Sequence, residues 1–560
     1  MRTDAQKTIG LQKMRAFTNT GADYLICVYL FLMLAVFPLY SQEGYAHIGT
    51  DKAYFFCRVS LCAGAILAVL LVIRGAAEGA AILKGISIHR KELSAEKGRT
   101  RRREKAREPE RELEKIFSSA DSFALLYGGA VLLSYVCSDY QENAFWGARG
   151  WYMGLVPQLT LVMIYFLVSR LWKPRSRMFL LMLAASAAVF LLGCLNRFDL
   201  YPIKMAYSSP EYISTIGNIN WFCGYAVTTA FFGVALLWLR QDWKPLQKVI
   251  LMLHAAAGFT ALVLQGSESG LAALGVILLA LFWKSAEDER RMSAFWQEVL
   301  LLGGCCLLIF AVRLLAPGRM NYVDGLGDLL TRGWLSAIIV IMSGVMLWLT
   351  ERSRRRGSYP KKGFRIAAVL VVCGCIVTVV SVIILAAVNT AHPGSIGVLS
   401  KYSLFTFDEE WGSSRGVTWL AGWKCFAEQD FLHKLTGVGP DCMAEYLYND
   451  AGSGLQVMVR ERFGYARLTN AHNEWLTVLV NTGLLGAISF AGMIVSGIKR
   501  LLQGGRKNPL AAACGFSLLG YTINNIFSFQ QAISAGTVFV IFGMGIAFLR
   551  AEETEESDNR

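Results

Sequence analysis

Long apolar runs separated by short polar segments dominate this sequence. About 20 mostly apolar residues in a helix cross the roughly 30 Å of hydrocarbon in a bilayer, so each run predicts a membrane-spanning helix. We expect about fourteen spans, or about twelve if the shortest runs do not cross. The predicted spans are residues 22–40, 54–73, 121–138, 152–171, 178–197, 219–239, 249–265, 270–284, 298–316, 334–350, 366–389, 478–500, 510–528 and 535–550.

The composition agrees with this pattern. Hydrophobic residues make up 54% of the 560 residues and charged residues 17%, whereas soluble domains average about 45–50% and about 25%. The sequence therefore predicts an all-α, polytopic membrane protein of about 12–14 transmembrane helices, with one long extracytoplasmic loop near the C-terminus. The short runs on either side of Glu268 leave open a single re-entrant hairpin at that point.

Basic residues gather in the loops on one side of these spans. An even number of spans places segments 74–120, 172–177, 351–365 and 499–507 on the same side as both termini. Lys and Arg are enriched in cytoplasmic loops, so we expect that side to be the cytoplasm. The net charge of +14 then indicates contact with membrane lipids and not with nucleic acid. Acidic residues alternate with basic ones in segment 74–120, which favours a solvated helix with ion pairs.

The loops divide the chain into four predicted parts. Of the 13 cysteines, Cys425 and Cys442 fall in the long loop, and the sequence leaves open whether they form a disulfide. The acidic end of the chain is expected to be disordered. The parts are an N-terminal membrane region at 1–389 that includes the basic loop 74–120, the large extracytoplasmic loop at 390–474, C-terminal membrane helices at 475–550, and a cytoplasmic acidic tail at 551–560.

The most informative polar positions lie within and just after the long loop. His472 and Asn473 stand where the chain becomes apolar again, and Gly483-Leu484-Leu485-Gly486 follows them. A Gly-x-x-Gly pair permits close helix approach. Earlier in the loop come Arg415-Gly-Val-Thr-Trp419 and Gly437-Val438-Gly439-Pro440. Together these positions resemble the signature of the O-antigen ligase and polymerase family. A weaker likeness extends to Gly217-Asn218-Ile219-Asn220 and Trp146-Gly147-Ala148-Arg149.

The resemblance implies a bacterial membrane glycosyltransferase that acts at the extracytoplasmic face of the plasma membrane. Its donor would be a polyprenyl-diphosphate-linked glycan, and its acceptor a hydroxyl of a glycan, a lipid or a protein. Arg415 would hold the diphosphate, because a guanidinium stays charged and fits phosphate oxygens in a fork. His472 would take the acceptor proton, because an imidazole with a pKa near about 6.5 suits a base at neutral pH.

Five further residues are candidate substrate-binding groups at the extracytoplasmic ends of the predicted spans. No Asp-x-Asp pair occurs in an extracytoplasmic loop, so we expect a metal-independent reaction without a cofactor. The five residues are Arg149, Asn220, Glu268, Arg319 and Asn473.

The sequence departs from the family pattern at two places. The stretch Gly266-Ser267-Glu268-Ser269-Gly270 lacks an arginine that the family often has there, and Ala487 and Ile488 stand where ligases often have two threonines. The second departure weakens a strict ligase assignment against a polymerase. A transporter or lipid-glycan flippase, a protein O-oligosaccharyltransferase and an inactive family member stay open. Polar residues clustered at one face favour an enzyme over a pore.

Overall fold

The computed structural model describes residues 2–93, 117–207, 209–239, 242–321, 325–505 and 507–558. Within these ranges, twelve helices are long and apolar enough to cross a membrane. Helices α7 (Leu155–Leu171) and α21 (Pro509–Asn524) are shorter and correspond to the other two predicted spans. The prediction of an all-α polytopic membrane protein with about 12–14 spans is therefore confirmed.

The remaining elements follow in chain order. The long helices are α1 (Arg2–Phe31) with its continuation η1 (Leu32–Val36) and α2 (Phe37–Leu39), α3 (Ile48–Leu93), α5 (Ser119–Cys137), α8 (Arg177–Arg197), α9 (Ile219–Leu239), α10 (Pro245–Leu264), α11 (Glu268–Ser285), α12 (Glu289–Leu315), α14 (Gly333–Arg355), α15 (Lys361–Ala391), α20 (Glu474–Gly504) and α22 (Ala532–Asp558). The shorter elements are α6 (Gln141–Trp146), β1 (Tyr212–Ile213), β2 (Gly217–Asn218), α13 (Gly325–Leu330), η2 (Gly397–Lys401), η3 (Ser403–Phe405), α16 (Trp411–Glu428), α17 (Phe431–Thr436), α18 (Met443–Asn449) and α19 (Ser453–Phe463).

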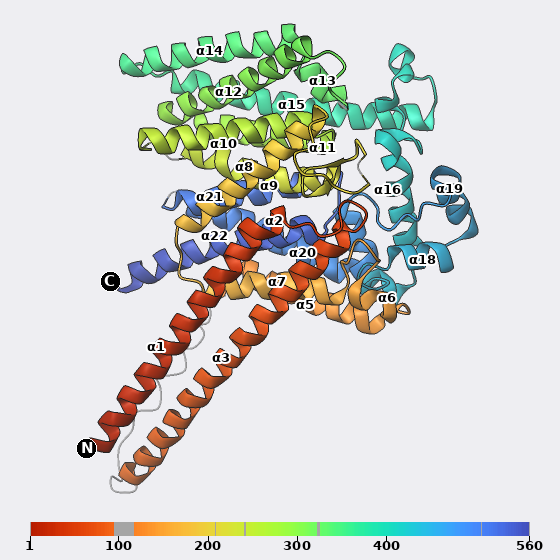
Figure 1. The fold of residues 1–560 in the computed structure, drawn as a ribbon. Helices are drawn as coiled ribbons and strands as arrows, with labels where there is room; N and C mark the ends of the chain where they lie inside the picture. The colour runs from red at the N-terminus through yellow and green to blue at the C-terminus, as the bar shows by residue number, and fades with distance from the viewer. Residues whose placement is uncertain are drawn as a thin grey trace.

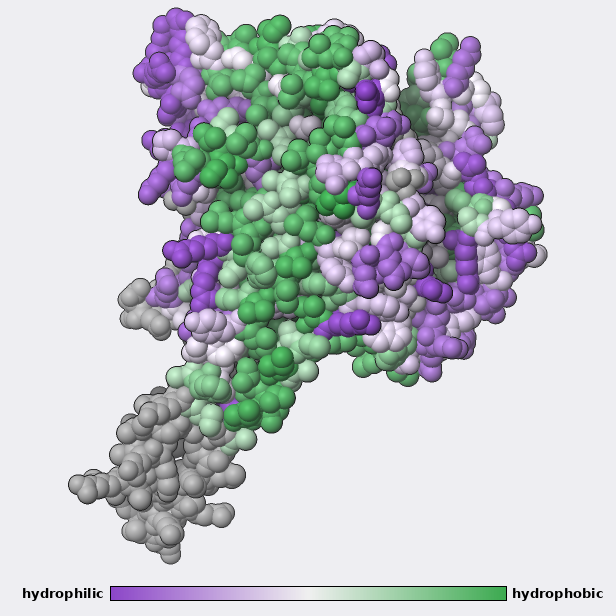
Figure 2. Space-filling model, in the orientation of Figure 1, coloured by the Kyte–Doolittle hydropathy of each residue, from purple (hydrophilic) through white to green (hydrophobic). Residues whose placement is uncertain are grey.

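The long helices form a bundle with two different ends (Figure 1). Helices α16, α18 and α19 gather at one end, and both labelled chain ends lie toward the other. We call residues 392–473, between α15 and α20, the loop region. A broad hydrophobic belt covers the bundle between two more polar ends (Figure 2). This distribution is expected of a protein that exposes its middle to lipid and its ends to water.

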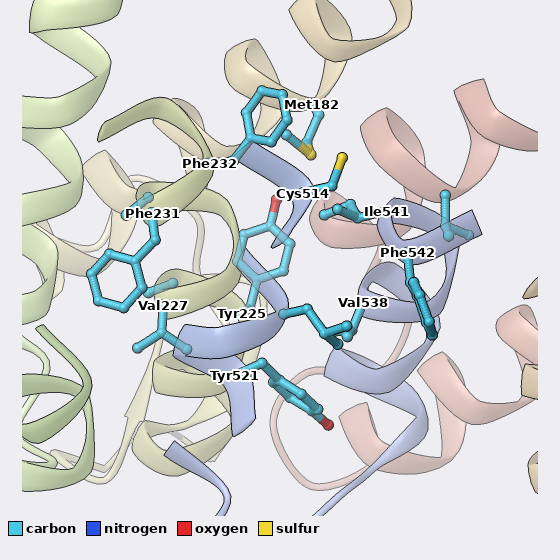
Figure 3. Close-up of a cluster of buried hydrophobic side chains, with 14 of the residues drawn as sticks. Met182, Tyr225, Val227, Phe231, Phe232, Cys514, Tyr521, Val538, Ile541 and Phe542 are labelled. Atoms are coloured by element: carbon cyan, nitrogen blue, oxygen red, sulfur yellow. The ribbon is translucent and has the colours of Figure 1, made fainter. Parts of the chain in front are cut away.

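The core of the bundle is built around α9 and α22. Their most apolar windows are 94% and 100% buried, as expected of helices that are apolar on all faces. α9 packs against α10, α21 and α22. Figure 3 shows the centre of this core, where Tyr225 of α9 lies among side chains of α21 and α22. The sixth and fourteenth predicted spans thus form the interior of the membrane domain.

Helices α14 and α15 lie at the edge of the bundle. Only 17% and 6% of their apolar windows are buried inside the protein, although α15 has the highest hydropathy of the twelve helices. Lipid tails are as apolar as leucine, so an apolar helix face needs no protein partner inside a membrane. High hydropathy in this chain therefore marks contact with lipid as readily as contact with the core.

Helix α20 is interrupted where the glycine pair was predicted to bring helices together. Gly483 adopts φ 63° and ψ −167°, a conformation open essentially to glycine. The freed carbonyls of Val480 and Asn481 accept hydrogen bonds from the backbone N–H groups of Val438 and Gly439, at 3.1 and 3.0 Å. A Cβ atom on Gly483 would collide with the Leu435 carbonyl. Gly483 therefore produces a kink at which the end of α17 (Phe431–Thr436) and the turn after it approach α20 closely.

The structure settles several smaller expectations. The chain around Glu268 forms two separate helices, α10 and α11, each long and apolar enough to cross a membrane, which favours two full spans over a single re-entrant hairpin. Cys425 and Cys442 are both buried free thiols. The tail that we expected to be disordered continues α22 as a helix to Asp558. Part of the predicted basic loop, residues 94–116, lies outside the described residues, and before it α3 continues to Leu93.

Candidate functional site

A polar cavity of about 400 Å³ lies between the loop region and the ends of α9 and α11. This volume lies within the range of about 300–1,000 Å³ that is typical of ligand pockets. Four predicted site residues line it together: Asn220, Glu268, Arg415 and His472. They come from positions spread over 250 residues of sequence, so only the fold brings them together. We call this space the site cavity.

Arg415 sits near the start of α16 on a tightly bent backbone. Its Nε donates to the Phe527 carbonyl and its Nη1 to the Gly412 carbonyl, both at 3.0 Å. Nη2 has no partner among the described residues, and the side chain lines the site cavity. Trp419, one helical turn later, stacks on Phe527 at a ring distance of 6.0 Å. The Arg-x-x-x-Trp spacing therefore lets both side chains contact the same segment.

His472 occupies a short turn immediately before α20. Its φ of 49° is uncommon for a residue other than glycine, and its N–H donates to Asn470 Oδ1 at 3.0 Å. The ring packs edge-on against Phe529 at 5.0 Å. Nδ1 is buried with no partner among the described residues, whereas the side chain lines the cavity. Burial, and then the positive charge of Arg415, lower the pKa of His472 to about 4.

The segment between α21 and α22, residues 525–531, contacts both of these residues. It offers the Phe527 carbonyl to Arg415 and the Phe529 ring to His472. Glu474, the first residue of α20, fixes this segment at two points. Its N–H donates to the Asn525 carbonyl at 2.9 Å, and its carboxylate accepts from the Gln530 N–H at 2.7 Å. One buried carboxyl thus positions the support of both candidate catalytic residues.

The opposite side of the cavity is formed by the start of α9 and the turn between α10 and α11. Ser267 Oγ donates to Asn220 Oδ1 at 2.9 Å and lies 2.8 Å from Ser269 Oγ. Ser269 in turn donates to Asn524 Oδ1 on α21 at 2.9 Å. A buried guanidinium, that of Arg197, fixes the end of α10 just before this turn, through bonds to the Leu264 and Gln265 carbonyls at 2.9 and 2.6 Å.

Glu268 is the acidic side chain of the cavity lining. It begins α11, where a carboxylate is favoured by the helix dipole. Its charge opposes the lowering of the Arg415 pKa that burial causes. The carboxylate and the guanidinium therefore face a shared space without forming a direct ion pair between described atoms.

Three predicted site residues lie outside the cavity lining. Asn473 is the N-cap of α20, where its side chain accepts from the Leu476 N–H at 3.2 Å. Arg149 is exposed in the turn before α7, and Arg319 is exposed after α12. Their substrate roles stay predictions, and the contact that the structure shows for Asn473 is a helix cap.

A buried aspartate connects two segments of the sequence pattern. Asp441 follows Gly439-Pro440, and its carboxylate accepts from the Ala148 and Met153 N–H groups at 2.8 and 3.1 Å. Burial raises the pKa of Asp441 to about 7, although these two hydrogen bonds act in the opposite direction. The turn that carries Arg149 is therefore attached to the loop region through Asp441. This contact joins two segments that both resemble the family pattern.

The residues that support the site were not predicted from the sequence. Glu474 had a visible signal, because an acid at the edge of an apolar run is costly unless it has partners. The Asn524-Asn525 pair was a similar signal inside an otherwise apolar run. The contacts of Phe527 and Phe529 left no local signal, because aromatic residues are common throughout this chain.

The fold and the site cavity define a class of protein. The chain is a polytopic membrane protein with a polar cavity, enclosed by a loop region, at one end of its bundle. Residues 325–491 match the family model described as O-Antigen ligase, and this match supports an O-antigen ligase and polymerase family assignment for that part of the chain. The matched segment includes Arg415 and His472 and ends before segment 525–531. No curated protein matches the chain.

Proposed function

We propose that this protein transfers a glycan from a polyprenyl diphosphate to an acceptor hydroxyl at the extracytoplasmic face of the bacterial plasma membrane. The family assignment supports an O-antigen ligase-like glycosyltransferase in general. The observation that carries the more specific proposal is the meeting of Arg415 and His472 in one cavity of ligand size. A diphosphate clamp and a base are the two groups that this transfer needs.

In this mechanism, the acceptor oxygen attacks the anomeric carbon of the donor while the bond to the diphosphate breaks. Negative charge grows on the leaving diphosphate, and Arg415, whose side chain lines the cavity, stabilises it with donors that its two backbone contacts leave available. His472 accepts the acceptor proton on the ring nitrogen that is not buried. Its low pKa, about 4, keeps the ring neutral and able to accept a proton at physiological pH.

The remaining lining residues orient the substrates. Asn220 and the serines of the 267–269 turn offer hydrogen-bonding groups for sugar hydroxyls. Glu268 lies where it can hold the acceptor hydroxyl near His472. The basic loops support the proposed orientation, with the loop region outside and both termini in the cytoplasm, because Lys and Arg are enriched in cytoplasmic loops. We propose no metal or cofactor for this step.

The test is transfer by the purified full-length protein. A polyprenyl-diphosphate glycan is supplied with glycan, lipid and protein acceptors, and the released polyprenyl diphosphate is measured. We expect His472→Ala to lower turnover by roughly 100-fold or more, the usual contribution of a general base, with donor binding retained. His392→Ala is the matched control, because His392 is exposed in the loop region outside the cavity lining. Full turnover by His472→Ala contradicts the proposal.

A further inference from the structure

The site cavity has too little positive charge for the donor that we propose. Among its lining residues, Arg415 and Glu268 have opposite formal charges, and His472 is neutral. A diphosphate carries negative charge on both phosphates, and buried charge requires compensation. One guanidinium beside a carboxylate leaves one of the two phosphates without a cation.

We infer that Arg462, on α19, is the second cation that binds the donor diphosphate; this inference rests on the proposed function. Arg462 Nε and Nη2 donate to Ser414 Oγ at 2.9 and 2.5 Å. Ser414 lines the site cavity directly before Arg415, and Phe463, directly after Arg462, lines it too. Two guanidinium groups from different helices thus meet at one turn of the cavity wall.

The backbone of that turn is unusual. Gly412, Ser413 and Ser414 have φ values of 60°, 60° and 71°, and left-handed conformations are costly for the two serines. Such strain persists where the surrounding structure enforces it, often at ligand sites. In this chain the strained turn places the Ser414 hydroxyl between the cavity and Arg462. A phosphate oxygen in the cavity can replace this hydroxyl as the hydrogen-bond acceptor of Arg462.

Three other arginines at this end of the bundle are already bound to carboxylates. Arg313 and Arg332 both contact Asp328, at 2.8 and 3.4 Å, and Arg467 contacts Glu445 at 2.6 Å. Arg462 contacts no carboxylate in the part of the chain that the structure describes, and its side chain is exposed. Arg462 is therefore a cation, already bonded to a residue of the cavity lining, that a diphosphate can recruit without breaking an ion pair.

The experiment measures binding of farnesyl diphosphate and farnesyl monophosphate to the purified full-length protein, with thermal melting as the check of folding. We expect Arg462→Ala to weaken diphosphate binding by roughly tenfold, the effect of one charged hydrogen bond. Monophosphate binding should change much less, because Arg415 alone can hold one phosphate. Arg462→Lys should keep part of the affinity. The matched control is Arg460→Ala, two residues earlier on α19 and exposed without a side-chain contact among the described residues.

The possible outcomes separate the two claims. If Arg462→Ala binds the diphosphate like Arg460→Ala while Arg415→Ala loses binding, the inference about Arg462 is wrong and the proposed function stands. An equal loss for the monophosphate and the diphosphate also contradicts it, because Arg462 then does not serve the second phosphate. If the wild-type protein binds neither compound, or if Arg415→Ala binds like the wild type, the proposed function fails.

Discussion

The two sides of the site cavity are held by different kinds of contact. Arg415 and His472 rest on one main-chain segment, residues 525–531, through a backbone carbonyl and a packed ring. Asn220 belongs instead to a chain of hydroxyl and amide groups that ends at Asn524. The first side fixes a charge and a base in single positions. The second offers several interchangeable polar groups.

This difference predicts unequal sensitivity to mutation. The Arg415 guanidinium is held in one position by two backbone carbonyls, and no other Lys or Arg among the described residues belongs to the cavity lining to replace its charge there. A hydroxyl network can rearrange when one member is removed, because serine hydroxyls rotate to new partners. We therefore expect large effects on the Arg415 and His472 side and small ones on the Asn220 side.

The largest effect is expected from breaking the kink in α20 that docks the loop region, which carries Arg415 and His472. Gly483→Ala should prevent correct folding, because its backbone conformation excludes a Cβ atom and the added methyl collides with the Leu435 carbonyl. The yield of monodisperse protein and its melting temperature are the measurements. Gly275→Ala in α11 is the control, since a Cβ there meets nothing within 4 Å. A normal melting temperature for Gly483→Ala would contradict this account of α20.

The next largest effect is expected from replacing Arg415, the positively charged residue of the first side. Arg415→Lys keeps the positive charge but cannot donate to the Phe527 and Gly412 carbonyls and to a phosphate at once. We expect turnover to fall roughly 100-fold, as on loss of a transition-state hydrogen bond donor. Initial rates of polyprenyl diphosphate release measure it, with Arg460→Lys as the control. Wild-type rates for Arg415→Lys would show that a point charge is sufficient.

The environment of the base predicts the pH profile. Since burial lowers the pKa of His472 to about 4, the ring should stay unprotonated from neutral pH down to that value. kcat/KM should then be level through pH 5–6 and fall about tenfold per unit below pH 4. Arg415→Gln removes a charge that lowers this pKa, so its acid limb should move upward. An acid limb near pH 6.5 in the wild type would contradict the burial argument.

The support segment can be loosened without touching either catalytic candidate. Glu474→Leu removes the acceptor for the Gln530 N–H, and we expect roughly tenfold lower turnover because misplaced reacting groups lose rate steeply. Glu474→Gln keeps an acceptor oxygen and should retain most of the activity. Turnover and donor affinity are measured for both variants. If the leucine and glutamine variants are equally active, the contact between Glu474 and the Gln530 N–H does not position the catalytic residues.

The smallest effect is expected on the second side. Asn220→Ala removes one acceptor, but Ser267 keeps Ser269 within reach. We expect a rise in the donor KM of about threefold, close to the value of one neutral hydrogen bond. Steady-state kinetics with varied donor measures it. A loss as large as that of Arg415→Lys would remove the distinction between the two sides.

Much of the fold and several site residues could be predicted from local patterns in the sequence. Apolar runs gave every spanning helix, because the hydrophobic thickness of a bilayer sets a length that is readable in one dimension. The Arg415-x-x-x-Trp419 and His472-Asn473 patterns were recognised through their resemblance to the O-antigen ligase and polymerase family. The kink at Gly483 was not predicted, because the segment that packs against it lies more than forty residues earlier in the sequence.

The sequence by itself determined that this chain spans a membrane, which residues are its candidate base and clamp, and which loop carries them. Only the tertiary structure decided that α9 is interior while the more apolar α15 faces lipid, that Asn220 and Glu268 share a cavity with Arg415 and His472, and that Glu474 supports them. The reason is physical. Hydropathy separates membrane from water, but lipid and protein interior are nearly equally apolar, so helix placement depends on packing and polar contacts between distant segments.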